Sequence, residues 1–213
     1  MINLDNVAEI VDVAAKTASS IPQLSKTGYD LTLDLAYEVQ RRSVKRRYDR
    51  GEKAVGIKMG FTSRAKIIQM GLDGMVWGRL TNKMLVEDGG EIDLKDFVHP
   101  RVEPEIAFLL KKPIEGIVSP AEAMLSVEAI APALEIIDSR YENFKFNLPD
   151  VVADNTSTSA YVGAAKLVAE DGGRLEAGWT IMAGGATAAE ALNPDIHVRL
   201  EVQNMGSVGF SVI

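Results

Sequence analysis

Three glutamates carry the strongest chemical signal in the sequence. Glu103 and Glu105 flank a proline within residues 102–106, and Glu135 stands inside the apolar segment 133–137. Alternate side chains share a face of a β-strand, so Glu103 and Glu105 point the same way, about 7 Å apart at their Cα atoms. Carboxylates this close repel unless a proton or cation intervenes, and hard oxygen ligands suit Mg²⁺ or Mn²⁺. We expect Glu103, Glu105 and Glu135 to bind one divalent cation.

A second interpretation of this cluster stays open at the level of sequence. Glu103 and Glu105 could form the solvated face of an edge strand, which the proline between them would permit. Glu135 favours the metal, because a carboxylate inside an apolar segment is costly without a partner. The chain has only two histidines, His99 and His197, so a polyhistidine site is excluded. We interpret His99 as a strand-end histidine and not as a ligand.

Lys58 is the second candidate for chemistry. It lies in the glycine-flanked segment 56–63, where the glycines let other groups approach the backbone. Its ammonium could hold a substrate carboxylate or transfer a proton. Alternatively, a lysine at a strand end extends to water. Thr62 and Ser63 predict the N-cap of a short helix through Gln69, whose amide groups could face an anion.

Two helices precede these residues. Apolar residues recur every three or four positions across residues 5–20, a pattern that predicts an amphipathic helix ending before Pro22. A second helix is predicted from Leu33 to Arg50, where Gly51 can form the C-terminal cap. We expect residues 1–50 to form an N-terminal helical cap over a catalytic domain of residues 51–213.

The remainder predicts a mainly β core. From Ala54 onward, frequent glycines separate short apolar segments, which is typical of strands and turns. Ser119, Pro120 and Glu122 form a capping box with proline at the first helical position, which predicts a helix continuing to residue 131. Further predicted elements are strands at 133–139 and 151–154 and a hairpin at 197–212 that turns near Met205 and Gly206.

Composition limits the class of protein. The chain has 213 residues, enough for one sizeable core, with 46% hydrophobic residues. Thirty acidic residues against 23 basic ones give a net charge of −7, which argues against nucleic acid or an anionic membrane as the main partner. The absence of cysteine excludes disulfides and thiolate chemistry. No apolar run approaches the ~18 residues of a membrane span and no signal peptide is visible, so a cytoplasmic location is expected.

Four motifs together resemble the fumarylacetoacetate hydrolase superfamily. They are residues 56–63, 99–105, 132–141 and 152–155. The similarity falls in the branch of metal-dependent decarboxylases and hydratases of aromatic meta-cleavage pathways. It implies an α+β fold with a mixed β-roll core and an N-terminal helical cap. It also implies Mg²⁺ or Mn²⁺ held by Glu103, Glu105 and Glu135, with Lys58 as a catalytic residue.

The resemblance also implies a reaction. Segments 77–80 and 141–146 are closer to the decarboxylases, which convert 2-oxohex-3-enedioate to 2-hydroxypenta-2,4-dienoate and CO₂. Hydration of 2-hydroxypenta-2,4-dienoate on the same site is the alternative, and a non-catalytic partner subunit is a third. Hydrolysis of an acylpyruvate ranks last, because we find no Glu-His pair to activate water. The expected partners are a small 2-oxo dicarboxylate, further copies of the chain, and a related hydratase.

Five residues are expected to contact the substrate. Phe61, Leu72 and Trp77 are candidates for an apolar wall around the departing carboxylate, and Ser157 and Thr187 for polar contacts.

The sequence departs from the family at two places. Relatives often have threonine where this chain has Ala183, and Thr187 is the candidate to replace it. Relatives also carry an additional segment between the strand at 159–163 and the following helix. Here the two abut, so we expect a loop to be missing near residues 163–164.

Overall fold

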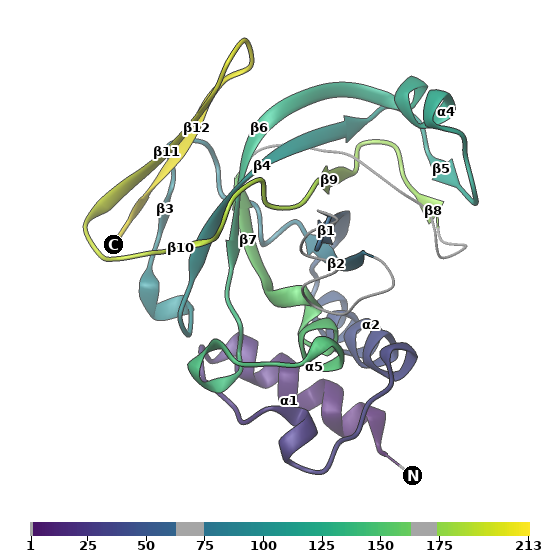
Figure 1. Cartoon of the computed structure of the whole chain (residues 1–213), viewed down its shortest axis with the longest axis vertical. Helices are drawn as coiled ribbons and strands as arrows, with labels where there is room; N and C mark the ends of the chain where they lie inside the picture. Colours follow the sequence, from purple (N-terminus) through teal and green to yellow (C-terminus); the bar gives the residue numbers. More distant parts are fainter. Residues whose placement is uncertain (1, 63–74, 163–173) are drawn as a thin grey trace.

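The core of the molecule is a mixed seven-stranded sheet, with helices α1, α2 and α5 at one end and the short helix α4 at the other (Figure 1). The computed structural model describes residues 2–62, 75–162 and 174–213. Strand order is β2-β1-β9-β4-β6-β7, with β10 paired to β4, and β1 and β9 are parallel. The predicted α+β fold with a mixed sheet and N-terminal helices is confirmed. The strands are β1 (Ala54–Gly60), β2 (Val76–Thr81), β4 (Arg101–Leu110), β6 (Val127–Ile137), β7 (Thr158–Val162), β9 (Thr180–Met182) and β10 (Glu190–Ala191).

The long pair β4 and β6 curves over the rest of the sheet and carries the acidic residues (Figure 1). Its register runs from Arg101 opposite Ile137 to Leu110 opposite Val127. The helix predicted from residue 119 is therefore wrong beyond α4 (Pro120–Leu125), although its capping box at Ser119 is confirmed. Residues 127–131 pair with the end of β4, and this non-local pairing outweighs their local helical pattern.

Both predicted N-terminal helices are confirmed. Helix α1 (Leu4–Lys16) starts at Asn3, whose side chain accepts from the Asn6 N–H, and α2 (Leu33–Asp49) starts similarly at Thr32. Gly51 follows α2 with a φ of 94°, a left-handed conformation that glycine adopts without strain.

The helices share one hydrophobic core with α5 (Leu148–Ala153) and the edge of the sheet. Gln40 of α2 is buried and donates to the carbonyls of Trp77 and Val152, which ties β2 and α5 together. The strand predicted at 151–154 is wrong, because a capping box between Asn147 and Asp150 starts α5 just before it. A domain boundary near residue 50 stays a prediction.

A smaller sheet packs beside the main one. Its order is β11 (Ile196–Val202), β12 (Gly206–Val212) and β3 (Glu91–Ile92), and the predicted C-terminal hairpin is confirmed. Strands β5 (Ile114–Glu115) and β8 (Arg174–Leu175) form a third, two-stranded sheet. Short 3₁₀ turns lie at Leu24–Lys26, Leu94–Asp96, Glu142–Phe144 and Asn155–Ser157. Across the described ranges, every helix is too short or too polar to cross a membrane.

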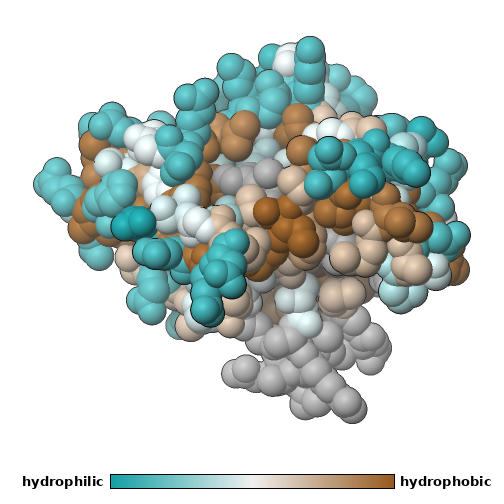
Figure 2. Space-filling view, turned by 90° about the horizontal axis from the view of Figure 1, so that it is seen from above, coloured by the Kyte–Doolittle hydropathy of each residue, from teal (hydrophilic) through white to brown (hydrophobic). Residues whose placement is uncertain are grey.

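Seen from the end opposite the N-terminal helices α1 and α2, the surface alternates hydrophilic and hydrophobic areas (Figure 2). Several large apolar side chains near α4 are exposed, namely Ile117, Met124, Leu125 and Ile130. Contiguous exposed apolar surface is typical of protein interfaces.

Candidate active site

The three predicted acidic residues lie together on the inner strands of the main sheet. Glu103 lies directly opposite Glu135 in the β4–β6 register, and Glu105 is opposite Ala133. One carboxylate oxygen from each glutamate lies within 4.8 Å of those of the other two. Strand β4 pairs with β6, β9 and β10, so the edge-strand interpretation does not apply.

Lys58 points from β1 into this cluster. Its Nζ lies 3.2 Å from Glu135 Oε2 and 3.1 Å from Oε1. Its side chain is 5% exposed, so it does not extend to water. Thr158 Oγ1 donates to Glu135 Oε1 at 3.1 Å, and Glu135 is thus held from both sides.

Glu105 is 2% exposed, and one of its two carboxylate oxygens lacks a partner among the described residues. The Gly184 N–H donates to its Oε2 at 2.9 Å, whereas its Oε1 has no hydrogen-bond partner within the described residues. Burial, and then the negative charge of Glu135, raise the pKa of Glu105 well above its usual value, although Lys58 opposes the shift.

The donor set fits a hard divalent cation. Three carboxylates gather beside the Lys58 ammonium, and hard oxygen donors of this kind suit a divalent cation. Glu105 Oε1, which has no partner among the described residues, would be free to bind such a cation.

Two glycines after β9 allow the chain to approach the cluster. A Cβ at Gly185 would lie 2.7 Å from Glu103 Cδ, and one at Gly184 would lie 2.5 Å from Thr62 Oγ1. Gly184 also has a φ of 93°. Glycine is therefore required where this backbone passes the carboxylates. The Gly-Gly pair is visible in the sequence and could have indicated this close approach.

A cavity of about 90 Å³ opens beside Lys58 and Glu103. Its polar lining comprises Lys58, Thr62, Glu103, Thr156 and Ser157, and its apolar lining comprises Met59, Phe61, Val76, Ile137, Phe144, Phe146 and Val151, with Gly60 and Gly185. The sequence singled out Lys58, Phe61, Glu103 and Ser157 among these, and it missed most of the apolar wall.

Two other expected substrate contacts lie away from the cavity. Trp77 follows Val76 on β2, so the two side chains lie on opposite faces of the sheet, and Val76 faces the cavity. The Trp77 ring stacks on Tyr37 at 5.4 Å between centroids. Thr187 is exposed and donates to the Ala188 carbonyl. Leu72 falls outside the described residues, as does the helix expected from Thr62 to Gln69. Substrate contacts by Trp77, Leu72 and Thr187 stay predictions.

A left-handed turn holds Ser157 at the cavity. Asn155, Thr156 and Ser157 have φ values of 50°, 53° and 61°, which are unfavourable for residues with a Cβ. The Asn155 side chain accepts from the Arg79 N–H and donates to the Arg79 carbonyl, which fixes the turn against β2. Ser157 Oγ is buried and has no hydrogen-bond partner in the described part of the chain, so it is available to a ligand.

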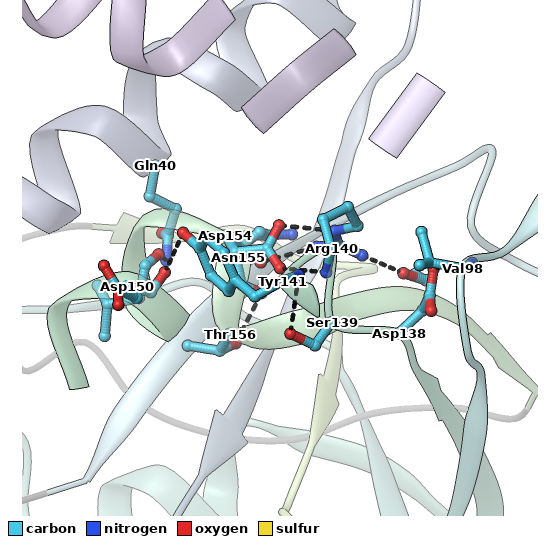
Figure 3. Close-up of polar contacts among 12 residues, drawn as sticks. Gln40, Val98, Asp138, Ser139, Arg140, Tyr141, Asp150, Asp154, Asn155 and Thr156 are labelled. Atoms are coloured by element: carbon cyan, nitrogen blue, oxygen red, sulfur yellow. Dashed lines mark hydrogen bonds and ion pairs between the residues drawn. The ribbon is translucent and has the colours of Figure 1, made fainter. Parts of the chain in front are cut away.

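A buried ion pair and several hydrogen bonds lie next to this turn (Figure 3). Arg140 Nε lies 2.6 Å from Asp154 Oδ1, and its Nη2 donates to the Asp154 carbonyl. Burial raises the pKa of Asp154 to about 6, even though Arg140 lowers it. Asp138 accepts from the N–H groups of Val98 and His99, which ties the approach to β4 to the end of β6.

Comparison with solved structures defines the class of fold. A 4-oxalocrotonate decarboxylase from Pseudomonas putida G7, complexed with magnesium and adipate, superimposes with a TM-score of 0.92 over 99% of this chain and 97% of its own, at 30% identity. A fumarylacetoacetate hydrolase family protein from Yersinia pestis shares the fold at a TM-score of 0.53 over 75% of this chain and 93% of its own, at 13% identity. The molecule has the fumarylacetoacetate hydrolase fold.

Sequence relatives define the family more closely. A 4-oxalocrotonate decarboxylase from a Pseudomonas species is 48% identical over 98% of this chain and 97% of its own. A 2-hydroxypent-2,4-dienoate hydratase from Pseudomonas putida is 34% identical over 67% of this chain and 65% of its own. No family model matches the chain. The chain belongs to the fumarylacetoacetate hydrolase superfamily, in the family that includes the 4-oxalocrotonate decarboxylases.

The alignment to the decarboxylase relative also bears on the missing loop. It spans 251 positions, more than the 213 residues of this chain, so the relative carries residues without a counterpart here. The expected place of the loop, near residues 163–164, lies outside the described residues.

Proposed function

We propose that this chain catalyses the metal-dependent decarboxylation of 2-oxohex-3-enedioate to 2-hydroxypenta-2,4-dienoate and CO₂. The observation that carries the proposal is one cavity in which Lys58 and Glu103 meet a wall of apolar side chains. Its family membership supports the same reaction.

Glu103, Glu105 and Glu135 would hold the ion through carboxylate oxygens. A bound Mg²⁺ or Mn²⁺ would supply Lewis-acid chemistry at the 2-oxo acid end of the substrate. The magnesium in the related crystal structure makes Mg²⁺ our first choice, with Mn²⁺ as the alternative.

Lys58 is proposed to donate a proton to the dienolate or to stabilise its negative charge. Loss of CO₂ from the dianionic substrate leaves an electron pair spread over the dienolate, and uptake of one proton at the C2 oxygen completes the product. The Lys58 Nζ can donate that proton or stabilise the negative charge there, because the buried contact with Glu135 fixes its position. Ser157 Oγ is a further donor for substrate oxygens.

The apolar wall is proposed to favour release of CO₂. A carboxylate loses its charge as CO₂ leaves, so poor solvation of that group lowers the barrier relative to water. The side chains of Phe61, Val76, Phe144 and Phe146 are hydrocarbon and carry no hydrogen-bond donor themselves. We place the departing carboxylate against these residues.

Hydration of 2-hydroxypenta-2,4-dienoate is the second candidate, since a hydratase relative is 34% identical to the chain. Both reactions would use the same carboxylates and Lys58. A non-catalytic partner subunit is the remaining alternative.

We further propose that residues 1–50 cap the site. We also propose that the chain forms homo-oligomers, to which the exposed apolar residues near α4 would contribute, and associates with a related hydratase.

One incubation separates these functions. The purified chain with Mg²⁺ and 2-oxohex-3-enedioate should release CO₂ and form 2-hydroxypenta-2,4-dienoate. Formation of 4-hydroxy-2-oxopentanoate from added 2-hydroxypenta-2,4-dienoate, without CO₂ from the enedioate, would establish the hydratase instead. No turnover of either compound by the chain alone would leave the partner-subunit role.

A further inference from the structure

Arg101 carries a positive charge beside two residues that line the cavity, Ile137 and Phe144. It lies two residues before Glu103 on β4, so strand alternation puts both side chains on the same face. Its neighbour in register on β6 is Ile137, which lines the cavity, and its neighbour on β10 is Ala191. Arg101 itself is exposed.

An aromatic ring of the cavity wall holds the Arg101 guanidinium. Arg101 Cζ lies 4.4 Å from the centroid of the Phe144 ring, and Phe144 lines the cavity. His99 and Phe146 pack on the same ring, at 5.3 Å and 5.9 Å between centroids. A cation over an exposed aromatic face is attracted by about 0.5–1 kcal/mol, which favours one position of the guanidinium without neutralising its charge.

Arg101 makes no salt bridge with any described residue, so no described carboxylate neutralises its positive charge. Arg140, by contrast, is buried and paired with Asp154. The chain carries a net charge of −7 and concentrates carboxylates at this site. Lys58 and a bound divalent cation would offset the charge of the three glutamates, and a further cation at the entrance would favour the approach of a doubly negative substrate.

We propose that Arg101 recognises the second carboxylate of a dicarboxylate substrate at the mouth of the cavity. This inference rests on the proposed function, because it takes the 2-oxo acid end to lie beside Glu103. The two-residue separation of Arg101 and Glu103 along β4 is about 7 Å, which matches the scale of an extended six-carbon diacid. Guanidinium also suits this task, because its planar fork accepts a carboxylate at two nitrogens.

Arg101 acts on capture and selection of the substrate, not on loss of CO₂. A strong ion pair with the departing carboxylate would stabilise the ground state and slow that step. The exposed guanidinium gives only a weak, water-screened pair, so the carboxylate is released readily to the apolar wall. Arg101 is thus a specificity-determining residue that distinguishes a dicarboxylate from a monocarboxylate.

Calorimetry in the presence of Mg²⁺ tests this role without turnover. The probes are 2-oxoadipate, the saturated analogue of the proposed substrate, and 2-oxohexanoate, which has a methyl group in place of the second carboxylate. Arg101→Gln should weaken binding of 2-oxoadipate ~2- to 5-fold and leave that of 2-oxohexanoate unchanged. Arg101→Lys should retain part of the preference. Arg199→Gln removes an exposed charge from β11 in the other sheet and is the matched control, for which both affinities should stay unchanged.

The preference of the wild-type protein should also decrease between low and high salt, because an exposed ion pair is screened. Equal loss for both acids in Arg101→Gln, no loss for either, or a wild-type protein that binds both acids equally would overturn the proposal. Its failure is distinguishable from failure of the decarboxylase function. CO₂ release by a chain whose Arg101→Gln variant binds normally rejects only the role of Arg101. A selective binding defect in a chain that releases no CO₂ rejects only the reaction.

Discussion

Glu135 lies directly opposite Glu103 on neighbouring antiparallel strands, with both carboxylates on the face that carries Glu105. Like charges directly opposite each other destabilise a sheet, and here one of them is fully buried. The carboxylate cluster therefore lowers the free energy of unfolding of the metal-free protein. Such a cost is expected where residues bind a cation.

Replacement of Glu105 should separate stability from metal binding. Glu105→Gln removes one of the crowded charges, so we expect the metal-free protein to gain roughly 1 kcal/mol in free energy of unfolding while its Mg²⁺ affinity falls at least tenfold. Thermal denaturation with and without Mg²⁺, together with calorimetry, measures both. Glu128→Gln changes an exposed glutamate on the same strand β6 and should alter neither. Unchanged Mg²⁺ binding in Glu105→Gln would remove this residue from the ligand set.

Substitution of Lys58 should affect catalysis more than folding of the site. Lys58→Ala removes the positioned ammonium beside Glu135, and kcat should fall by ~10²-fold or more. Mg²⁺ affinity should rise or stay constant, because a neighbouring positive charge is lost. Steady-state kinetics at saturating Mg²⁺ and calorimetry give the two quantities. A variant that loses Mg²⁺ binding and retains kcat would show that Lys58 organises the carboxylates and does not act on the substrate.

The glycine after β9 should be required for the position of Glu103. In Gly185→Ala the new Cβ would lie 2.7 Å from Glu103 Cδ, so the carboxylate must move. We expect Mg²⁺ affinity to fall by about tenfold or more with the fold intact, as monitored by calorimetry and circular dichroism. Adding Glu103→Asp shortens the obstructed side chain and should restore part of the affinity. Absence of rescue would indicate that the glycine is needed for backbone conformation alone.

The buried pair behind the site predicts a pH effect on stability. Asp154 has its pKa raised from 3.8 to about 6 by burial, so the folded state keeps this proton while the unfolded state releases it. The contribution of Asp154 to stability is therefore complete below pH ~4 and decreases as pH rises to about 6, by up to about 3 kcal/mol. Urea denaturation from pH 4 to 7 should show the stability cost of Asp154→Asn decreasing over this range. A cost that increases with pH would mean that attraction to Arg140 outweighs burial.

Local patterns in the sequence predicted the parts of the molecule that depend on local structure. Helix α1, helix α2 and the C-terminal hairpin follow from periodicity and caps, and the shared face of Glu103 and Glu105 follows from strand alternation. The first half of β6 was mispredicted as a helix, because its pairing with β4 makes it a strand. Helix α5 was mispredicted as a strand, because the cap at Asn147 starts a helix there.

The cavity wall was harder to predict for the same physical reason. Val76, Phe144 and Val151 come from separate segments that meet only through tertiary packing, so no spacing in the sequence links them. Trp77 is a candidate for the wall because it is apolar, whereas its neighbour Val76 is the residue of β2 that lines the cavity. The approach of Gly185 to Glu103 likewise depends on β9 lying beside β4.

Val76 provides the sharpest test of the apolar wall, because Val→Thr changes polarity at nearly constant shape. Val76 is buried and lines the cavity, so Val76→Thr would place a hydroxyl beside the departing carboxylate. A hydrogen bond to that group stabilises its charge before CO₂ leaves, and kcat should fall by about tenfold, with KM unchanged or lower. Val39→Thr makes the same exchange at a buried position of α2 outside the cavity lining. Both substitutions bury a hydroxyl and should lower the free energy of unfolding by about 1–3 kcal/mol. Val39→Thr should leave kcat unchanged. Equal kcat in the two variants would mean that desolvation by this wall does not contribute to decarboxylation.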